Sequence, residues 1–244
     1  MCQVHFTSGK LSWDVFYITK IFKTLEGKTM NFISRKFPEF NDLLQDKKHE
    51  PKFVTKVRNI TEIIYQKHSE EIKKSIGKFE ICWEVIESQF IETLSSIFEI
   101  KKTDLGREFT CFVGINPICP RSIKDGTFSV PFYVRCDTLK KLIAHEMVHF
   151  FYFTKIVKID QHLNPGNFDK HSFEWLMSEI IAPVILSDIR IHKIVGNDTI
   201  YSYVCSKSMS ETIHDLYKRI RNNEWSFEKF YLTTKEFVSQ RIER

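Results

Sequence analysis

The feature that most constrains this chain is an apolar segment carrying three ionisable side chains, His145, Glu146 and His149. No Pro or Gly interrupts residues 137–153, and the segment ends in four consecutive aromatic residues. Asp137 is a suitable N-cap, so we expect one helix from that residue onward. A helix this apolar should be buried, and buried imidazole and carboxylate groups need partners that offset their desolvation. The segment is therefore expected near the centre of the fold.

The spacing of these three side chains fits a catalytic metal site. His145 and His149 are four residues apart, so on a helix they lie on one face, one turn from each other. Both imidazoles can then bind one ion, while Glu146 lies about 100° around the helix beside them. This arrangement is typical of zinc sites that leave a position open for water and place a carboxylate next to it as general base. A satisfied polar cluster in the core is the alternative, and we favour the metal.

A catalytic zinc ion normally has three protein ligands, and no close third ligand follows His149. The downstream candidates are His162, Asp169, His171, Glu174 and Glu179. Glu179 is favoured because it lies inside the apolar run 177–186, where a carboxylate needs a compensating cation. Glu174 is the main alternative, although it lies in a polar first helical turn, where an acidic residue complements the helix dipole without any further role.

Apolar periodicity and the positions of Pro and Gly divide the rest of the chain. Helices are expected at 13–25, 38–45, 54–73, 78–100, 210–221 and 226–242, with a further helix from near His171 that kinks or ends at Pro183. Strands are expected at 2–7, 109–115 and 127–134. Pro131 cannot donate to a sheet ladder, so the last strand is expected at an edge, where an extended peptide could pair with it. We expect a mainly helical region (1–105), a core (106–186) and a helical C-terminal region (187–244), forming one compact unit.

Composition and charge argue against several classes of protein. The chain has 244 residues and a formal net charge of +5 that is spread along the sequence, so there is no nucleic-acid footprint. No apolar run approaches the roughly 18 residues that cross a bilayer, and the start lacks a secretory signal. The six cysteines form no Cys-x-x-Cys pair, and we expect free, mostly buried thiols in a reducing compartment. The expected location is cytoplasmic, without a nucleic-acid or membrane partner.

The two helical motifs together resemble the gluzincins, zinc metallopeptidases of the peptidase MA-like group. The resemblance rests on His145-Glu146-Met147-Val148-His149 and, further along, on Trp175-Leu176-Met177-Ser178-Glu179-Ile180-Ile181-Ala182. Many small gluzincins have Trp-Leu-x-Glu-Gly-x-Ala at the second position. This chain has one extra residue before Glu179 and an isoleucine in place of the glycine. The resemblance covers about residues 108–186. It implies an α+β, zincin-like fold in which a small sheet, with an edge strand, packs on the active-site helix and is surrounded by further helices.

The resemblance also implies a chemistry. His145, His149 and Glu179 would bind Zn2+, and Glu146 would be the general base of a hydrolase that cleaves a peptide or protein substrate. A Tyr or His from the downstream region would stabilise the oxyanion, and the candidates are Tyr201, Tyr203 and His214. The alternative is a catalytically inactive protein of the same fold that acts as a binding or regulatory module. Glu146 argues against that alternative, because a purely structural zinc site does not require it.

Overall fold

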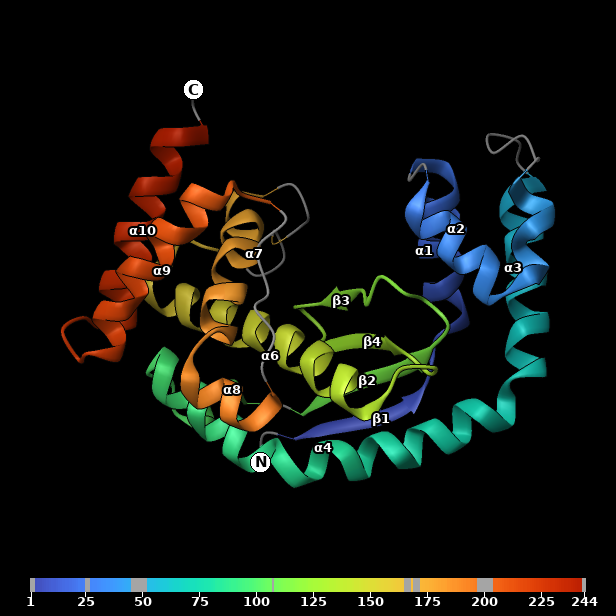
Figure 1. The fold of residues 1–244 in the computed structure, drawn as a ribbon, viewed down its shortest axis with the longest axis horizontal. Helices are drawn as coiled ribbons and strands as arrows, with labels where there is room; N and C mark the ends of the chain where they lie inside the picture. Colours follow the sequence, from blue (N-terminus) through green and yellow to red (C-terminus); the bar gives the residue numbers. More distant parts are fainter. Residues whose placement is uncertain are drawn as a thin grey trace.

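The computed structural model describes residues 3–24, 27–44, 52–106, 108–164, 168, 172–196 and 204–242. It is an α+β protein in which helices surround a small mixed sheet (Figure 1), and this confirms the predicted class. The strands are β1 (Val4–Ser8), β2 (Phe109–Gly114), β3 (Arg121–Ser122) and β4 (Thr127–Pro131). The helices before β2 are α1 (Leu11–Thr24), α2 (Lys28–Lys36), the 3-10 helix η1 (Pro38–Leu44), α3 (Lys52–Lys67), α4 (Ser69–Phe98) and α5 (Lys102–Leu105). Those after β4 are α6 (Cys136–Ile159), α7 (Phe173–Leu186), α8 (Ile189–Val195), α9 (Lys207–Arg221) and α10 (Phe227–Ile242).

The sheet has the strand order β1-β2-β4-β3. The first three of these strands are parallel, and β3 is antiparallel to β4. The prediction that β4 is an edge strand is therefore wrong, since β4 lies between β2 and β3. Pro131 is tolerated there because it is the last residue of β4, opposite Gly114, where the ladder ends. On the other side, the backbone N–H of Ser129 donates to the carbonyl of Pro120 at 2.9 Å, so the segment ending in β3 forms the edge.

Helix α6 lies at the centre of the molecule, as its apolar sequence predicts. Aromatic rings anchor it to the sheet: the Phe150 ring centroid is 4.7 Å from that of Phe109 in β2 and 6.1 Å from that of Phe128 in β4. On another side, Phe151 packs against Phe98 of α4 at 5.9 Å. Burying such side chains contributes about 2–3 kcal/mol each, so the orientation of α6 relative to the sheet is strongly determined.

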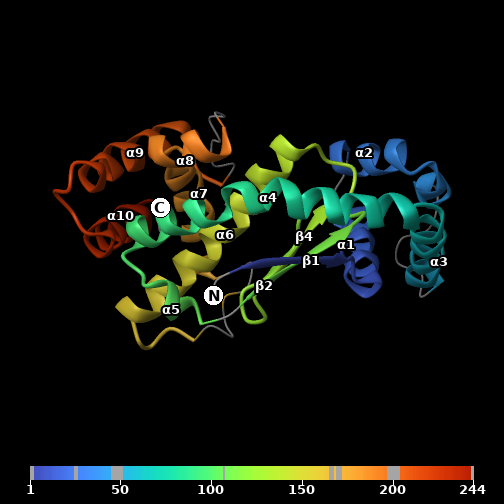
Figure 2. The same cartoon turned by 90° about the horizontal axis from the view of Figure 1, so that it is seen from below.

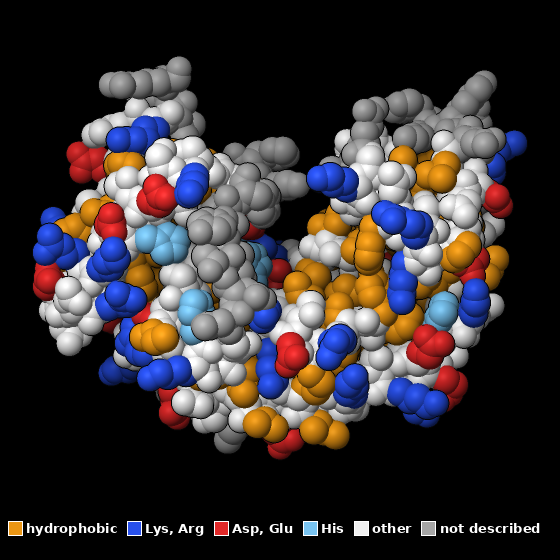
Figure 3. All heavy atoms as spheres, viewed as in Figure 1, with side chains coloured by type: hydrophobic (Ala, Val, Ile, Leu, Met, Phe, Trp, Pro, Cys, Tyr) orange, Lys and Arg blue, Asp and Glu red, His pale blue; other side chains and the backbone are white. Residues whose placement is uncertain are grey.

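The long helix α4 connects the two ends of the molecule. It has 30 residues and runs along most of the length of the structure, as Figure 2 shows from below. Helices α1 to α3 lie at one end and α7 to α10 at the other, and the space-filling view shows a deep hollow between these two groups (Figure 3). The sheet and α6 lie between them. Within the described ranges, no helix is both long enough and apolar enough to span a membrane.

A buried carboxylate links the helices at one end to the sheet. Asp14 of α1 is 2% exposed and accepts hydrogen bonds from the Tyr65 hydroxyl of α3 at 2.6 Å and from the backbone N–H of Ile115 at 3.1 Å. Burial raises the pKa of Asp14 to about 6, although both hydrogen bonds oppose the shift. The strand ends approach closely here, because a Cβ on Gly9 would lie 2.8 Å from the Cα of Gly114. Asp14 therefore holds α1 and α3 against the start of the loop that leads to β3.

A disulfide joins α4 to the first residue of α6. It links Cys82 and Cys136, whose Cα atoms are 5.9 Å apart, a normal separation for such a bond. The expectation that the cysteines are free thiols is wrong for this pair, because a sequence separation of 54 residues gives no sign of pairing. The described cysteines that are free are Cys111, Cys119 and Cys205. The disulfide also removes the main argument for a reducing compartment.

Candidate metal centre

Helix α6 brings its two histidines together on one face. The Nε2 atoms of His145 and His149 are 3.0 Å apart, as the four-residue spacing predicts. The His149 side chain is fully buried, whereas that of His145 is 23% exposed. The Nδ1 atom of His149 is buried and has no hydrogen-bond partner among the described residues. The two rings therefore face a common point through Nε2, and His145 lies on the side of the pair that solvent reaches.

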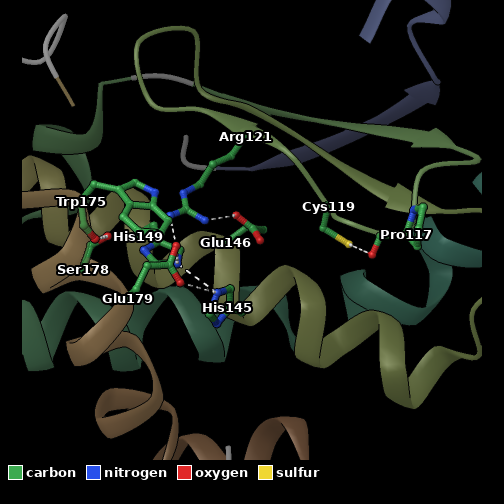
Figure 4. Close-up of polar contacts among 9 residues, drawn as sticks. All are labelled: Pro117, Cys119, Arg121, His145, Glu146, His149, Trp175, Ser178 and Glu179. Atoms are coloured by element: carbon green, nitrogen blue, oxygen red, sulfur yellow. Dashed lines mark hydrogen bonds and ion pairs between the residues drawn. The ribbon is translucent and has the colours of Figure 1, made fainter. Parts of the chain in front are cut away.

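Helix α7 places Glu179 opposite the two rings. Its first turn is fixed by Ser172, whose hydroxyl accepts a hydrogen bond from the Trp175 backbone N–H, and the residues from Met177 to Leu186 are buried. The helix continues through Pro183 to Leu186, so of the two expected outcomes, a kink or an end at that residue, the end does not occur. The Glu179 carboxylate lies 3.9 Å from His145 Nε2 and 3.8 Å from His149 Nε2. Figure 4 shows the three side chains converging from α6 and α7.

These three residues fit a zinc ion. Each offers one ligand atom, and the atoms all lie within 4.8 Å of one another. Nitrogen and oxygen ligands that are each about 2.0–2.1 Å from a tetrahedral zinc ion lie about 3.3 Å apart, so the observed separations of 3.0, 3.8 and 3.9 Å need only small adjustments. Two imidazoles and one carboxylate are a known donor set of catalytic zinc. This is the one such group of His, Cys, Asp or Glu side chains found in the described part of the chain.

A fourth side chain, Arg121 of β3, was not predicted from the sequence. Its Nη1 atom donates to Glu146 Oε2 at 3.2 Å, and its Nη2 atom donates to Glu179 Oε1 at 2.6 Å. Figure 4 shows the guanidinium descending from β3 to lie between the two carboxylates. The Arg121 side chain is only 13% exposed. It therefore supplies the positive charge that two buried carboxylates require.

Burial determines the protonation of the cluster. It raises the pKa of Glu146 to about 7, an effect that Arg121 opposes and the Glu179 charge reinforces. Burial and the nearby Arg121 lower the pKa of His145 to about 4. The same two causes, with His145 as a third, hold the pKa of His149 well below its usual value. Both imidazoles are therefore neutral at neutral pH, which is the form that binds a metal ion.

The other ligand candidates lie elsewhere or cannot be placed. Glu174 is half-buried in the first turn of α7 and does not belong to the ligand group. Burial and then the Glu174 charge raise the pKa of Tyr231 to about 12, so Glu174 lies near that ring of α10. His162 is exposed. Asp169 and His171 lie outside the described residues.

Of the three residues expected to stabilise the oxyanion, two cannot be placed and one makes a contact within its own helix. Tyr201 and Tyr203 lie outside the described residues. His214 of α9 is half-buried, and its Nδ1 atom is 2.8 Å from the Ser210 carbonyl one turn earlier. This contact engages one ring nitrogen of His214 within its own helix.

Comparison with protein-family models, with curated proteins and with solved structures found no match. The functional assignment therefore depends on the site itself.

Proposed function

We propose that this protein is a zinc-dependent metallopeptidase of the gluzincin type. The observation that carries the proposal is the convergence of His145, His149 and Glu179, with Glu146 one residue after the first of them. A structural zinc site would need a fourth protein ligand, and it would not need a base beside the metal. Here the described ligand group has three members, which is typical of a site that keeps one coordination position for water.

Each residue has a defined task in this proposal. A bound zinc ion would polarise the scissile carbonyl and lower the pKa of a water molecule. Glu146 takes the proton from the attacking water and passes it to the leaving amine. Burial raises the pKa of Glu146 to about 7, and a cation bound beside it would lower that pKa and keep the base ionised. The neutral rings of His145 and His149 and the Glu179 carboxylate hold the ion.

One observation favours the alternative function, a catalytically inactive binding or regulatory protein of this fold. The carboxylate of Glu146 is in an ion pair with Arg121 at 3.2 Å, and a base held by a cation accepts a proton less readily. The metallopeptidase requires both zinc and turnover, whereas the binding module requires no turnover and can exist with or without zinc, so both quantities are measured on the same sample.

The test uses three substitutions that remove one carboxylate charge each. Glu146→Gln should keep zinc and lower hydrolysis of a mixed fluorogenic peptide library by at least ~100-fold, because only the base is lost. Glu179→Gln should weaken zinc binding in a chelator competition by at least ~10-fold. Glu174→Gln, on the same helix as Glu179 but outside the ligand group, is the matched control and should change neither quantity.

The outcomes separate the two functions. Zinc binding without turnover by the wild-type chain would transfer the assignment to the binding module. A wild-type chain that takes up no zinc would refute the metallopeptidase and leave only a binding or regulatory protein that works without the metal. If Glu174→Gln weakens zinc binding more than Glu179→Gln does, the third ligand is Glu174, and the apolar surroundings of Glu179 have another explanation.

A further inference from the structure

Arg121 offsets the charge of two buried carboxylates, and its position beside the proposed base and the proposed metal ligand also suits it to contact a substrate. Its guanidinium bridges two carboxylates that come from two different helices. Glu146 Oε2 and Glu179 Oε1 are 3.2 and 2.6 Å from its two terminal nitrogens. A guanidinium carries more N–H donors than these two bonds use. It is therefore equipped to donate to a third acceptor while it remains held in place.

The exposure of the side chains shows from which side a ligand must approach. Glu146, His149 and Glu179 are 4%, 0% and 3% exposed, whereas Arg121 and His145 are 13% and 23% exposed. A molecule that reaches the cluster from solvent therefore meets Arg121 and His145 first. Arg121 belongs to β3 and His145 to α6, and both elements lie between the two helical groups (Figure 1).

The proximity of Arg121 to the general base limits its distance from the reacting atoms. A water activated by Glu146 must lie within about 2.6–3.2 Å of that carboxylate, and Arg121 Nη1 is 3.2 Å from Glu146 Oε2. Every position that such a water can occupy on Oε2 is then within about 6.4 Å of Arg121 Nη1. The carbonyl under attack lies in the same small volume, and its oxygen becomes negatively charged as the water adds to the carbon.

We propose that Arg121 is the catalytic residue that stabilises the oxyanion formed during peptide hydrolysis. The proposal rests on the proposed function and assigns a role for which the sequence offered only Tyr201, Tyr203 and His214. The water oxygen bonds to the carbonyl carbon, Glu146 receives the proton, and the carbonyl π electrons move to the oxygen. The Arg121 guanidinium donates to that oxygen. When the C–N bond breaks, the amine leaves with the proton from Glu146, and the oxygen returns to a carbonyl.

Peptide turnover gives the first measurement. Arg121→Gln should lower kcat/KM by about 100- to 1,000-fold, the range for loss of one oxyanion donor, with zinc content retained. Arg121→Lys keeps the positive charge but loses the planar fork of N–H donors. Its kcat/KM should therefore lie between those of the wild type and Arg121→Gln. Arg58→Gln, on the exposed face of α3, is the control for loss of an arginine charge and should act like the wild type.

Binding of phenylphosphonate to the zinc-loaded chain gives a second measurement that requires no turnover. This tetrahedral anion imitates the charge and shape of the oxyanion, and calorimetry should show that Arg121→Gln binds it at least about 10-fold more weakly than Arg58→Gln does, as expected for a lost charge-assisted bond. Equal phosphonate affinity in these two variants would overturn the assignment. If the wild-type chain cleaves no peptide, the proposed function and the catalytic role of Arg121 both fail, and the phosphonate comparison then shows only whether Arg121 binds a tetrahedral anion.

A last pair of variants covers the case in which Arg121→Gln does not fold. Removing the arginine alone leaves two buried carboxylates without their cation, which is destabilising. The double variant Arg121→Met/Glu146→Gln removes one charge of each sign, and it is compared with Glu146→Gln alone. The double variant should bind phenylphosphonate at least about 10-fold more weakly. Equal affinity in this pair also overturns the proposal.

Discussion

Asp14 provides the sharpest test of the energetics of this fold, because it is a buried acid whose pKa is far from its usual value. Its pKa rises from 3.8 to about 6 in the folded chain, mainly through burial. Between these values the folded state holds a proton that the unfolded state has released. The free energy of unfolding must therefore fall as pH rises from about 4 to 6, and above that range the cost stays constant.

The size of this effect follows from the shift. One pKa unit corresponds to about 1.4 kcal/mol, so a rise from 3.8 to about 6 costs the folded chain about 3 kcal/mol once the group is fully ionised. Between pH 4 and pH 8 the change is about 2–3 kcal/mol, because titration of the unfolded state has already begun at pH 4. The side chain is almost completely buried, so solvent screening does not reduce this value much.

The Asp14→Asn variant removes the titration and keeps an oxygen that accepts from Tyr65 or Ile115. Urea unfolding at pH 4 and pH 8 should show that wild type loses about 2–3 kcal/mol more than Asp14→Asn over this interval. Other titrating groups are common to both proteins and cancel. The exposed Asp42→Asn variant is the control and should follow the wild type. Parallel pH profiles for wild type and Asp14→Asn would refute the claim that burial raises the pKa of this carboxylate.

Two further predictions concern stability. Gly9→Ala should destabilise the fold by about 1–3 kcal/mol, because its Cβ would lie 2.8 Å from the Cα of Gly114. Gly77→Ala should instead stabilise it by about 1 kcal/mol, because this position in α4 has open space around it and alanine favours the helix. Urea unfolding measures both, and equal effects would contradict the close approach of β1 and β2. Reduction of the Cys82–Cys136 bond, which closes a loop of 54 residues, should lower the free energy of unfolding by about 2–4 kcal/mol. Unfolding with and without reductant, with thiol labelling to follow reduction, tests this, and an unchanged midpoint would contradict it.

The sequence predicted the parts of the site that depend on local periodicity and on burial. His145 and His149 were expected on one helical face, and their Nε2 atoms are 3.0 Å apart. Glu179 was favoured over Glu174 by its apolar neighbours and by the resemblance of residues 175–182 to gluzincins, and it is Glu179 that lies 3.8–3.9 Å from the two rings. Both arguments work because a helix fixes the direction of each side chain, and because an enclosed carboxylate must have a partner.

The features that were missed depend on contacts between distant segments. Arg121 follows a proline in a stretch that was expected to be a loop, and nothing in its local sequence shows that it faces two carboxylates 25 and 58 residues away. The position of β4 was wrong for a similar reason. Pro131 excludes a hydrogen bond only at its own position, and the two-residue strand β3 that covers β4 is too short to be recognised from periodicity.

The charges of the cluster connect these contacts to the proposed chemistry. With both carboxylates ionised and both imidazoles neutral, Arg121, Glu146 and Glu179 together carry one net negative charge in a buried site. Such a charge is costly, and the raised pKa of Glu146, about 7, shows that proton uptake by the base is one way to remove it. A divalent cation bound by Glu179 and the two rings would remove it in another way, and it would also lower the pKa of Glu146. Metal binding and an ionised base are therefore thermodynamically linked. The ion that would polarise the substrate would at the same time bring Glu146 into the form that accepts a proton.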